Sequence, residues 1–184
     1  SAKAEGKPTN PFVDVAEGAY YYDPVLWAVA NGITSGVDTT HFDPNGTCTR
    51  AHAVTFLWRA AGQPEPKTTQ RPFKDVKAGS YYEKAVLWAV ENKITNGTST
   101  TTFSPDKNCT RAQIVTFLWR SEGEPYASDS NNPFTDIASD YYMDAVFWAV
   151  KEGITNGTTP TTFSPNDRCT RAQIVTFIYR AMHL

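Results

Sequence analysis

Residues 109–120 read CTRAQIVTFLWR, and this stretch decides the fold because it contains the start of a helix. Thr110 at the N-cap and Gln113 three residues later form a capping box, in which two unpaired backbone N–H groups find acceptors. Cys109 before the cap and Ile114 after it occupy the positions of a hydrophobic staple. The triplet Thr-Arg-Ala begins at Thr49, Thr110 and Thr170. The chain therefore contains three copies of one unit of about 60 residues.

Other landmarks recur in the same order in every copy. Each copy has a Pro-Phe dipeptide, a tyrosine pair, a tryptophan, a loop glycine and a Phe-x-Pro segment before Thr-Arg-Ala. The tyrosine pairs are Tyr21-Tyr22, Tyr81-Tyr82 and Tyr141-Tyr142. The segments between copies are rich in Gly, Pro and small polar residues, which is typical of repeat boundaries. We therefore predict an N-terminal tail over residues 1–10 and repeats over residues 11–62, 72–123 and 133–184.

Each repeat is predicted to contain two helices separated by a polar loop. In the second copy the first helix includes AVLWAVENK, and its residues Val86, Leu87 and Val90 fall on one side. Asparagine or glycine near residues 31, 92 and 153 ends these helices. The second helices run from Thr-Arg-Ala to Arg59, Arg120 and Arg180. One copy cannot bury its apolar faces, so we expect a mainly α fold in which three helix-loop-helix repeats pack around one axis.

Composition argues against two classes of partner. The 184 residues are 40% hydrophobic and have a formal net charge of −2, which argues against nucleic acid bound through bulk basic charge. No apolar run approaches the roughly 18 residues that a membrane-spanning helix requires, so we expect no membrane insertion. The chain begins SAKAEGKPTN without a signal peptide. We expect a fragment of a longer protein that is monomeric on its own.

Three cysteines, Cys48, Cys109 and Cys169, each stand directly before a helix cap. Their odd number and the lack of a CxxC pair argue against a disulfide framework. The simplest interpretation is a small buried residue that closes the start of each helix. The alternative is a three-thiol metal or redox site on the threefold axis, which requires the three side chains to converge. We prefer the first interpretation and predict no metal and no cofactor.

An arginine directly follows each helix cap, at Arg50, Arg111 and Arg171. A cation at a helix N-terminus adds to the positive end of the helix dipole, so its threefold recurrence requires an explanation. One explanation is an anion site, in which the guanidinium and the first-turn N–H groups bind a carboxylate or phosphate. The other is an ion pair with a nearby aspartate, such as Asp14, Asp75 or Asp136. The residues alone favour neither explanation.

The first copy differs from the others at the start of its second helix. His52 stands where the other copies have glutamine, and Ala53 stands where they have isoleucine. We expect a weaker capping box and staple there, by about 0.5–1 kcal/mol for the lost cap partner. His52 has no Cys, His or Asp at ligand spacing, so a surface position on the helix is a better interpretation than a metal or acid–base site.

The repeated elements resemble the S-layer homology (SLH) domain over residues 11–182. Phe-x-Asp, the tryptophan-centred first helix, the loop glycine, Phe-x-Pro and Thr-Arg-Ala occur in that order in all three copies, and Gln follows Thr-Arg-Ala in the second and third copies. The family signature ends Ile-Thr-Arg-Ala-Glu, whereas this chain has Cys for Ile in every copy and Gln, Gln or His for Glu. The resemblance implies a three-pronged spindle, in which the second helices pack about a pseudo-threefold axis.

The resemblance also implies a function. SLH trimers anchor secreted surface proteins to the secondary cell-wall polysaccharide of bacteria, at the cell wall or S-layer. The favoured ligand is a pyruvylated amino sugar, bound in grooves between neighbouring repeats. By motif position, Arg50, Arg111 and Arg171 bind the ligand carboxylate. In the same way, the middle loop would approach the sugar through Gly36, Gly97 and Gly157.

Two further sets of residues match the family motifs. Trp27, Trp88 and Trp148 match its first-helix aromatic and could stack on a sugar, although core packing is the preferred interpretation. Asp14, Asp75 and Asp136 match its Phe-x-Asp, and we prefer to interpret them as turn or cap acceptors. Because His52 and Ala53 weaken the first copy, we predict that loss of Arg50 reduces binding less than loss of Arg111 or Arg171.

The pattern favours a binding module over an enzyme. A glycosidase needs two carboxylates at a defined separation, and no second repeated carboxylate accompanies the aspartates. The sequence also has no GxSxG and no HExxH motif. The alternative function is self-association or protein–protein contact within a surface layer.

Overall fold

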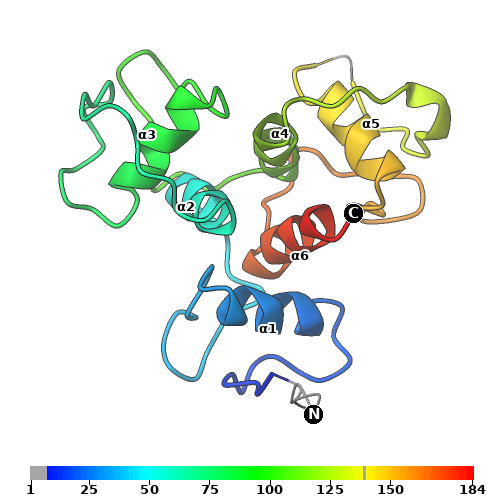
Figure 1. The fold of residues 1–184 in the computed structure, drawn as a ribbon. Coiled ribbons are helices and arrows are strands. Elements are labelled where there is room, and N and C mark those ends of the chain that lie inside the picture. Colours follow the sequence, from blue (N-terminus) through cyan, green and yellow to red (C-terminus); the bar gives the residue numbers. More distant parts are fainter. Residues whose placement is uncertain (1–7, 139) are drawn as a thin grey trace, which may run out of the picture.

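The computed structural model describes residues 8–138 and 140–184 (Figure 1). Within those residues the chain is helical and forms no β-strand beyond isolated bridges, so the prediction of a mainly α fold is confirmed. The elements are α1 (Tyr22–Ala30), α2 (Arg50–Ala60), α3 (Glu83–Glu91), α4 (Arg111–Ser121), the 3₁₀ helix η1 (Asp129–Asn131), α5 (Met143–Lys151) and α6 (Arg171–Met182). No helix in these ranges is both long and apolar enough to cross a membrane.

Helices α2, α4 and α6 begin at the predicted threonine caps. The side chains of Thr110 and Thr170 accept from the backbone N–H three residues later, and the glutamine at that position accepts in return at 3.0 Å. In α2 the same box forms with a histidine, whose Nδ1 lies 3.4 Å from the Thr49 nitrogen. The first box is therefore formed, with one longer hydrogen bond, as expected from the weaker partner.

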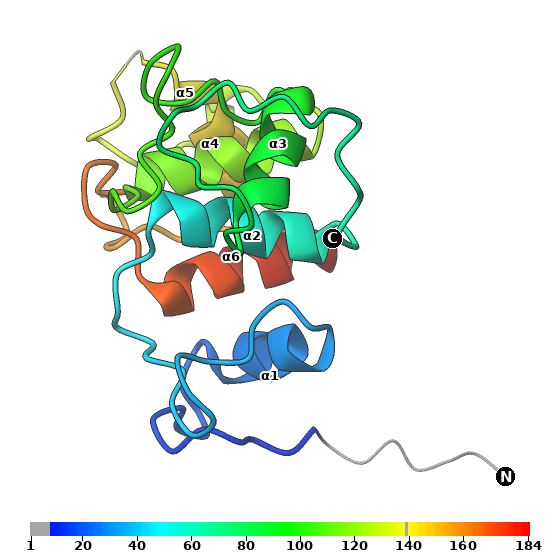
Figure 2. The same ribbon diagram turned by 90° about the vertical axis from the view of Figure 1, so that its left-hand side faces the viewer.

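The outer helix of each repeat packs against the inner helix of the repeat before it. Helix α3 packs on α2, and α5 packs on α4. Helix α1, which has no preceding repeat, packs on α6 from the far end of the chain. Figure 1 shows α2, α4 and α6 in contact at the centre with α1, α3 and α5 outside them. Figure 2 shows the α1 segment from the side, below α6. The sequence repeat is therefore not the packing unit.

The three inner helices are joined at their starts by a closed ring of backbone hydrogen bonds. Cys48 N donates to Cys169 O at 3.0 Å, Cys109 N donates to Cys48 O at 2.8 Å, and Cys169 N donates to Cys109 O at 2.9 Å. All three cysteines are buried and free. Burial raises the pKa of their thiols, that of Cys109 to about 12. The cysteines thus close the helix starts, as the simpler interpretation predicts.

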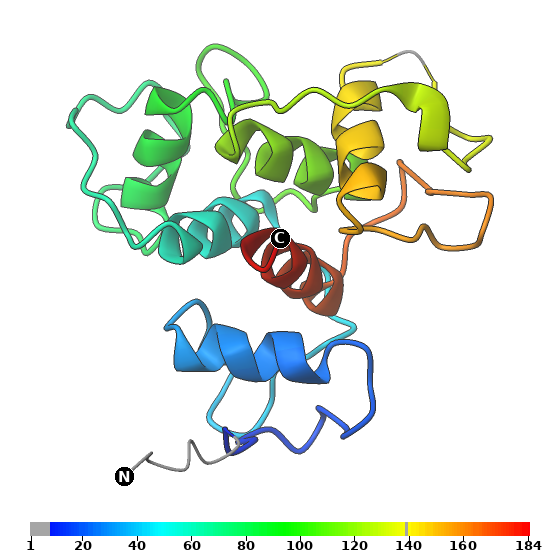
Figure 3. The same cartoon turned by 45° about the vertical axis from the view of Figure 1, so that its right-hand side comes forward.

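The core lies between the inner and outer helices and extends below each middle loop. The phenylalanine of every Phe-x-Pro segment is fully buried, and the phenylalanine of every Pro-Phe dipeptide packs against it at 5.8–5.9 Å between ring centroids. These pairs are Phe12 with Phe42, Phe73 with Phe103, and Phe134 with Phe163. Figure 3 shows the C-terminus at the end of α6, in the middle of the molecule. The core therefore fixes the middle loops beside the inner helices.

Candidate binding grooves

Each arginine at the start of an inner helix reaches into the next repeat. Nε of Arg50, Arg111 and Arg171 donates to the carbonyl oxygens of Phe103, Phe163 and Phe42 respectively, at 2.8 Å in all three cases. The Cζ atoms lie 4.8–4.9 Å from the centroids of the same rings. The three side chains are at most 5% exposed, and burial lowers the pKa of all three guanidinium groups. These arginines are therefore fixed in place before any ligand arrives.

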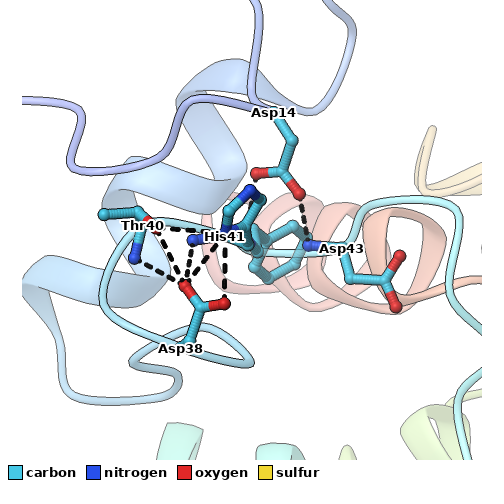
Figure 4. Close-up of polar contacts among 6 residues, drawn as sticks. Asp14, Asp38, Thr40, His41 and Asp43 are labelled. Atoms are coloured by element: carbon cyan, nitrogen blue, oxygen red, sulfur yellow. Dashed lines mark hydrogen bonds and ion pairs between the residues drawn. The ribbon is translucent and has the colours of Figure 1, made fainter.

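The aspartates of Phe-x-Asp hold the other side of the same phenylalanines. Asp75 accepts from the backbone N–H groups of Phe103 and Ser104 at 2.8 Å, while Arg50 binds the Phe103 carbonyl. Asp14 and Asp136 make the equivalent pairs of hydrogen bonds, and Figure 4 shows the one from Asp43 to Asp14. Within the described ranges no ion pair joins these aspartates to the arginines. The preferred interpretation as turn acceptors fits, and the ion-pair explanation for the arginines does not.

The guanidinium groups differ in the partners of their outer nitrogens. Nη2 of Arg50 donates to the Thr95 hydroxyl at 3.3 Å. Nη2 of Arg111 and Nη2 of Arg171 are buried without any hydrogen-bond partner. Most buried polar groups in proteins are hydrogen-bonded, so an unpaired buried donor needs an explanation. The Nη2 atoms of Arg111 and Arg171 therefore keep an unused hydrogen-bond donor.

The Arg171 groove is a cavity of about 400 Å³ built from all three repeats. Repeat 3 contributes Arg171, repeat 2 contributes Tyr81, and repeat 1 contributes its middle loop and one face of α2. The lining residues from repeat 1 are Thr34, Ser35, Gly36, Val37, Asp43, Thr47, His52, Thr55, Phe56 and Arg59. From the sequence we expected His52 to weaken the groove that contains Arg50. In the structure His52 instead lines the groove that contains Arg171.

The Arg111 groove is the equivalent cavity one repeat earlier, with a volume of about 430 Å³. Arg111 comes from repeat 2 and Tyr20 from repeat 1. Repeat 3 contributes Thr155, Asn156, Gly157, Thr158, Gln173, Thr176, Phe177 and Arg180. Both grooves therefore combine two arginines, a tyrosine, a middle loop with hydroxyl side chains and a capping-box residue.

The middle loops are folded tightly over the grooves. Gly97 has φ +86°, and a Cβ there would lie 2.5 Å from the Phe73 ring and from the Thr102 carbonyl oxygen. A Cβ at Gly36 or Gly157 would come equally close to the equivalent phenylalanine ring and backbone carbonyl oxygen of its own repeat. Glycine is thus required by the fold at these positions, and the resulting loop lines the grooves.

The loop of repeat 1 is closed by a carboxylate. Asp38 accepts from the backbone N–H groups of Thr40 at 2.7 Å and of His41 at 2.8 Å (Figure 4). These hydrogen bonds, the one from Thr40 first, lower the pKa of Asp38 to about 2. In repeats 2 and 3 the hydroxyls of Ser99 and Thr159 accept at the corresponding turn. The first loop therefore has a carboxylate at a turn where the other two loops have a hydroxyl group.

The tryptophans lie in the helix–helix interfaces. Trp88 and Trp148 are 8% and 2% exposed, and Trp27 packs on Tyr179 of α6 with ring centroids 5.5 Å apart. Neither groove described above is lined by a tryptophan. Core packing, the preferred interpretation, agrees with this placement.

A profile of the S-layer homology domain matches residues 11–54, 72–115 and 133–175, which is more than half of the chain. The chain belongs to the S-layer homology domain family. The family resemblance inferred from the repeated motifs is therefore confirmed, and with it a location at the bacterial cell surface.

Curated relatives of this SLH chain include surface proteins and enzymes. It is 32% identical to the surface-layer 125 kDa protein of Lysinibacillus sphaericus over 169 residues, covering 89% of this chain and 14% of that protein. It is 28% identical to the cellulosome-anchoring protein of Acetivibrio thermocellus, covering 77% and 33%. It is 36% identical to an endoglucanase of Bacillus sp. (strain KSM-635), covering 66% and 13%. The chain thus spans a minor part of each of these relatives, the endoglucanase included.

Sequence reasoning missed several groove residues of this SLH chain. Arg59 and Arg180 end the inner helices and donate to the Ile33 and Ile154 carbonyls at 3.0 and 2.9 Å. The threonines on the same helix faces are Thr55 and Thr176. Their threefold recurrence in the sequence was the available signal. It does not separate groove residues from core residues, because both recur.

The tyrosine pair of the first repeat was predicted one residue too late. The paired rings are Tyr20 and Tyr21, packed edge to face at 5.0 Å like Tyr81 with Tyr82 and Tyr141 with Tyr142. The first tyrosine of each pair is about half exposed, and in both grooves it forms a wall. The second packs against the core. Repeat 1 has three consecutive tyrosines, so the sequence did not show which two align with the tyrosine pairs of the other repeats. The start of α1 at Tyr22 shows that Tyr20 and Tyr21 do.

Proposed function

We propose that this SLH chain anchors the protein that contains it to the bacterial cell wall. It does so by binding a carboxylate-bearing unit of secondary wall polysaccharide in the Arg111 and Arg171 grooves. The observation that carries the proposal is the buried Nη2 atom of each arginine, which lacks a partner. A guanidinium already fixed through Nε can direct its remaining N–H groups at a carboxylate without losing further side-chain freedom.

The groove walls favour a sugar as the group that bears the carboxylate. Tyr20 and Tyr81 present half-exposed rings, which suit the apolar face of a pyranose. The loop opposite provides hydroxyl and amide groups from Thr155, Asn156 and Thr158 in the Arg111 groove. A pyruvate ketal on an amino sugar supplies the carboxylate and the sugar ring together. We therefore propose a pyruvylated amino sugar as the ligand.

We further propose that the repeats act together as a single-chain trimeric spindle. The contacts among α2, α4 and α6, and the ring through Cys48, Cys109 and Cys169, support a threefold arrangement. Grooves that bind units of one polymer raise the overall affinity by effective concentration, without any new contact. The names of the surface-layer and cellulosome-anchoring relatives support the anchoring role. The isolated chain is proposed to be a monomer that works without a cofactor.

The chain itself is proposed to be non-catalytic. Both carboxylate oxygens of Asp14, Asp75 and Asp136 accept backbone N–H groups, so none is positioned as a general acid. The match to the endoglucanase covers 13% of that enzyme. Catalytic activity of a parent protein would therefore come from another domain.

The test is binding of the chain to purified wall polysaccharide before and after chemical removal of pyruvate ketals. We expect removal to abolish most of the binding. Arg111→Lys and Arg171→Lys should also weaken binding, because lysine keeps the charge but loses the planar fork. Unchanged binding after ketal removal would contradict the carboxylate model. If the chain ignores the wall polymer and instead grows in mass with concentration in sedimentation velocity, the alternative of self-association holds.

A further inference from the structure

Lysine is unevenly distributed among the repeats. Six of the nine lysines lie between residues 67 and 107, whereas repeat 1 has none and repeat 3 has one. Repeat 2 contains seven basic and five acidic residues, repeat 1 contains two and five, and repeat 3 contains four and five. Only repeat 2 therefore has a positive formal charge. The two grooves take their arginines from all three repeats, so they do not account for this excess.

Three of these lysines, Lys74, Lys77 and Lys107, line one cavity in repeat 2, which we call the lysine cavity. Its volume is about 560 Å³, which is larger than that of either groove. It shares no lining residue with the Arg111 and Arg171 grooves, and Arg50 does not line it. The lysine cavity is therefore separate from the grooves described above.

The backbone determines where these lysines lie. Asp75, between Lys74 and Lys77 in the sequence, accepts from the backbone N–H groups of residues 103 and 104 at 2.8 Å. The backbone N–H of Lys107 donates to the carbonyl oxygen of Ser104 at 3.2 Å. The two segments that contain the lysines are thus joined without any contribution from the lysine side chains.

The ammonium groups have no partner in the protein. All three lysines are exposed, and within residues 8–138 and 140–184 their side chains make no hydrogen bond and no ion pair. Both oxygens of Asp75 are occupied by the backbone, which leaves Asp106 as the one acidic lining residue whose oxygens accept no hydrogen bond. Three like charges beside one carboxylate repel one another, and a bound anion would relieve that repulsion.

The fold does not require lysine at these positions. The backbone hydrogen bond from Arg50 N to the Lys107 carbonyl, 2.9 Å long, has equivalents of the same length at the other two helix starts, where the acceptor residue is not lysine. The positions equivalent to the three lysines are Val13, Ala16 and Gly46 in repeat 1, and Thr135, Ala138 and Asp167 in repeat 3. A cluster that occurs in one repeat only and makes no contact within the protein points to a ligand.

We propose that the lysine cavity is a second anion site, which binds phosphodiester groups of a polymer at the cell surface. Lysine binds phosphate as a point charge, whereas a planar, bidentate contact requires the fork of arginine that the grooves contain. The apolar lining residues, Tyr82 and Pro105, are partly or fully buried, so no exposed apolar side chain lines the cavity to insert into a bilayer. This inference goes beyond the proposed function and does not depend on it.

The test is calorimetric binding of the full chain to poly(glycerol phosphate) at low ionic strength. Each exposed ion pair contributes about two- to threefold in affinity, so the triple variant Lys74→Gln/Lys77→Gln/Lys107→Gln should bind about tenfold more weakly or worse. Its thermal unfolding midpoint should stay the same or rise, because the three side chains make no contact and repel one another.

The matched control is the triple variant Lys67→Gln/Lys84→Gln/Lys93→Gln. It removes the same charge from lysines that do not line the cavity, and should bind less than about threefold more weakly than wild type. Equal losses in the two triple variants would show that total charge alone matters, and would overturn the site.

Two further probes test the kind of ligand. Polygalacturonate, a carboxylate polymer, should bind the first triple variant and wild type within about threefold of each other; a loss as large as for poly(glycerol phosphate) would contradict the phosphate assignment. Binding to phosphatidylglycerol vesicles without binding to poly(glycerol phosphate) would contradict a polymer as the source. Because poly(glycerol phosphate) has no carboxylate, these results are independent of the ketal-removal test of the grooves.

Discussion

The Arg171 groove and the site around Arg50 occupy equivalent places in the repeat, yet their guanidinium groups are satisfied differently. Arg171 leaves Nη2 buried and unpaired, whereas Arg50 donates the same atom to Thr95. Thr55 in the Arg171 groove also has a buried hydroxyl without a partner, while its counterpart Thr116 donates to Ala112 O at 2.7 Å. Arg171 therefore keeps an unused N–H donor, whereas the same donor of Arg50 is already engaged within the protein.

The comparison shows that a residue that differs in one repeat can line a groove whose arginine belongs to another repeat. His52 and Thr55 belong to repeat 1, but they line the groove whose arginine is Arg171. The loop opposite Arg50 belongs to repeat 2 and supplies Thr95. That loss of Arg50 reduces binding least remains a prediction, and its basis is now that Nη2 of Arg50 already has a partner.

The largest expected effect comes from replacing the arginines by lysine. Arg171→Lys should weaken binding to pyruvylated wall polysaccharide about tenfold or more, as expected for loss of a charged hydrogen bond. Arg50→Lys should weaken it less than about threefold, because Nη2 of Arg50 is already engaged. Isothermal titration with the same glycan preparation measures both. Equal losses would show that Thr95 does not close the Arg50 site.

Removing the hydroxyl of the equivalent threonine from each inner helix should affect stability differently in the first repeat than in the other two. Thr116→Val and Thr176→Val each break a buried 2.7 Å hydrogen bond and should lower the free energy of unfolding by about 1 kcal/mol. Thr55→Val removes an unpaired buried hydroxyl and should leave stability unchanged or raise it. Chemical denaturation gives all three values. A loss for Thr55→Val as large as for the other two would mean that its hydroxyl is satisfied in solution.

The closing contact of the Arg50 site can be removed with an internal control. Thr95→Val and Thr155→Val both lose an acceptor for the N–H of the following loop glycine. Only Thr95→Val also releases Nη2 of Arg50. It should therefore be the less stable variant, by about 0.5–1 kcal/mol, and its Arg50 site should bind the glycan better. Indistinguishable stabilities would count against the Arg50–Thr95 hydrogen bond.

The smallest expected effect is the pH dependence that His52 adds. Burial first, and then the charge of Arg171, lower its pKa in the folded chain. The unfolded chain then binds more protons than the folded one as the pH falls below about 6.5, so stability contributed by His52 is present above that pH and is lost on acidification. Melting temperatures of wild type should therefore fall slightly more than those of His52→Gln between pH 7 and pH 5. Parallel curves would contradict the lowered pKa.

The sequence predicts what depends on neighbours along the chain. The caps at Thr110 and Thr170, the ends of the outer helices and the burial of the cysteines follow from local rules, and the structure agrees. Contacts between repeats depend on the tertiary arrangement instead. No spacing indicates that α1 packs on α6 or that Arg50 bonds to Phe103. The order in which the three repeats pack around their common centre determines which arginine and which middle loop line the same groove.

The contact between α1 and α6 would affect how this chain bears mechanical load. These helices lie at opposite ends of the sequence, so tension applied between the two ends would act directly on their shared interface. Tension between one end and a polymer held in the grooves follows another route. It passes through Arg171 or Arg111 to a phenylalanine carbonyl in the neighbouring repeat. Under the proposed function, force between one end of the chain and a bound polymer would therefore act on contacts between repeats and not on one helix pair alone.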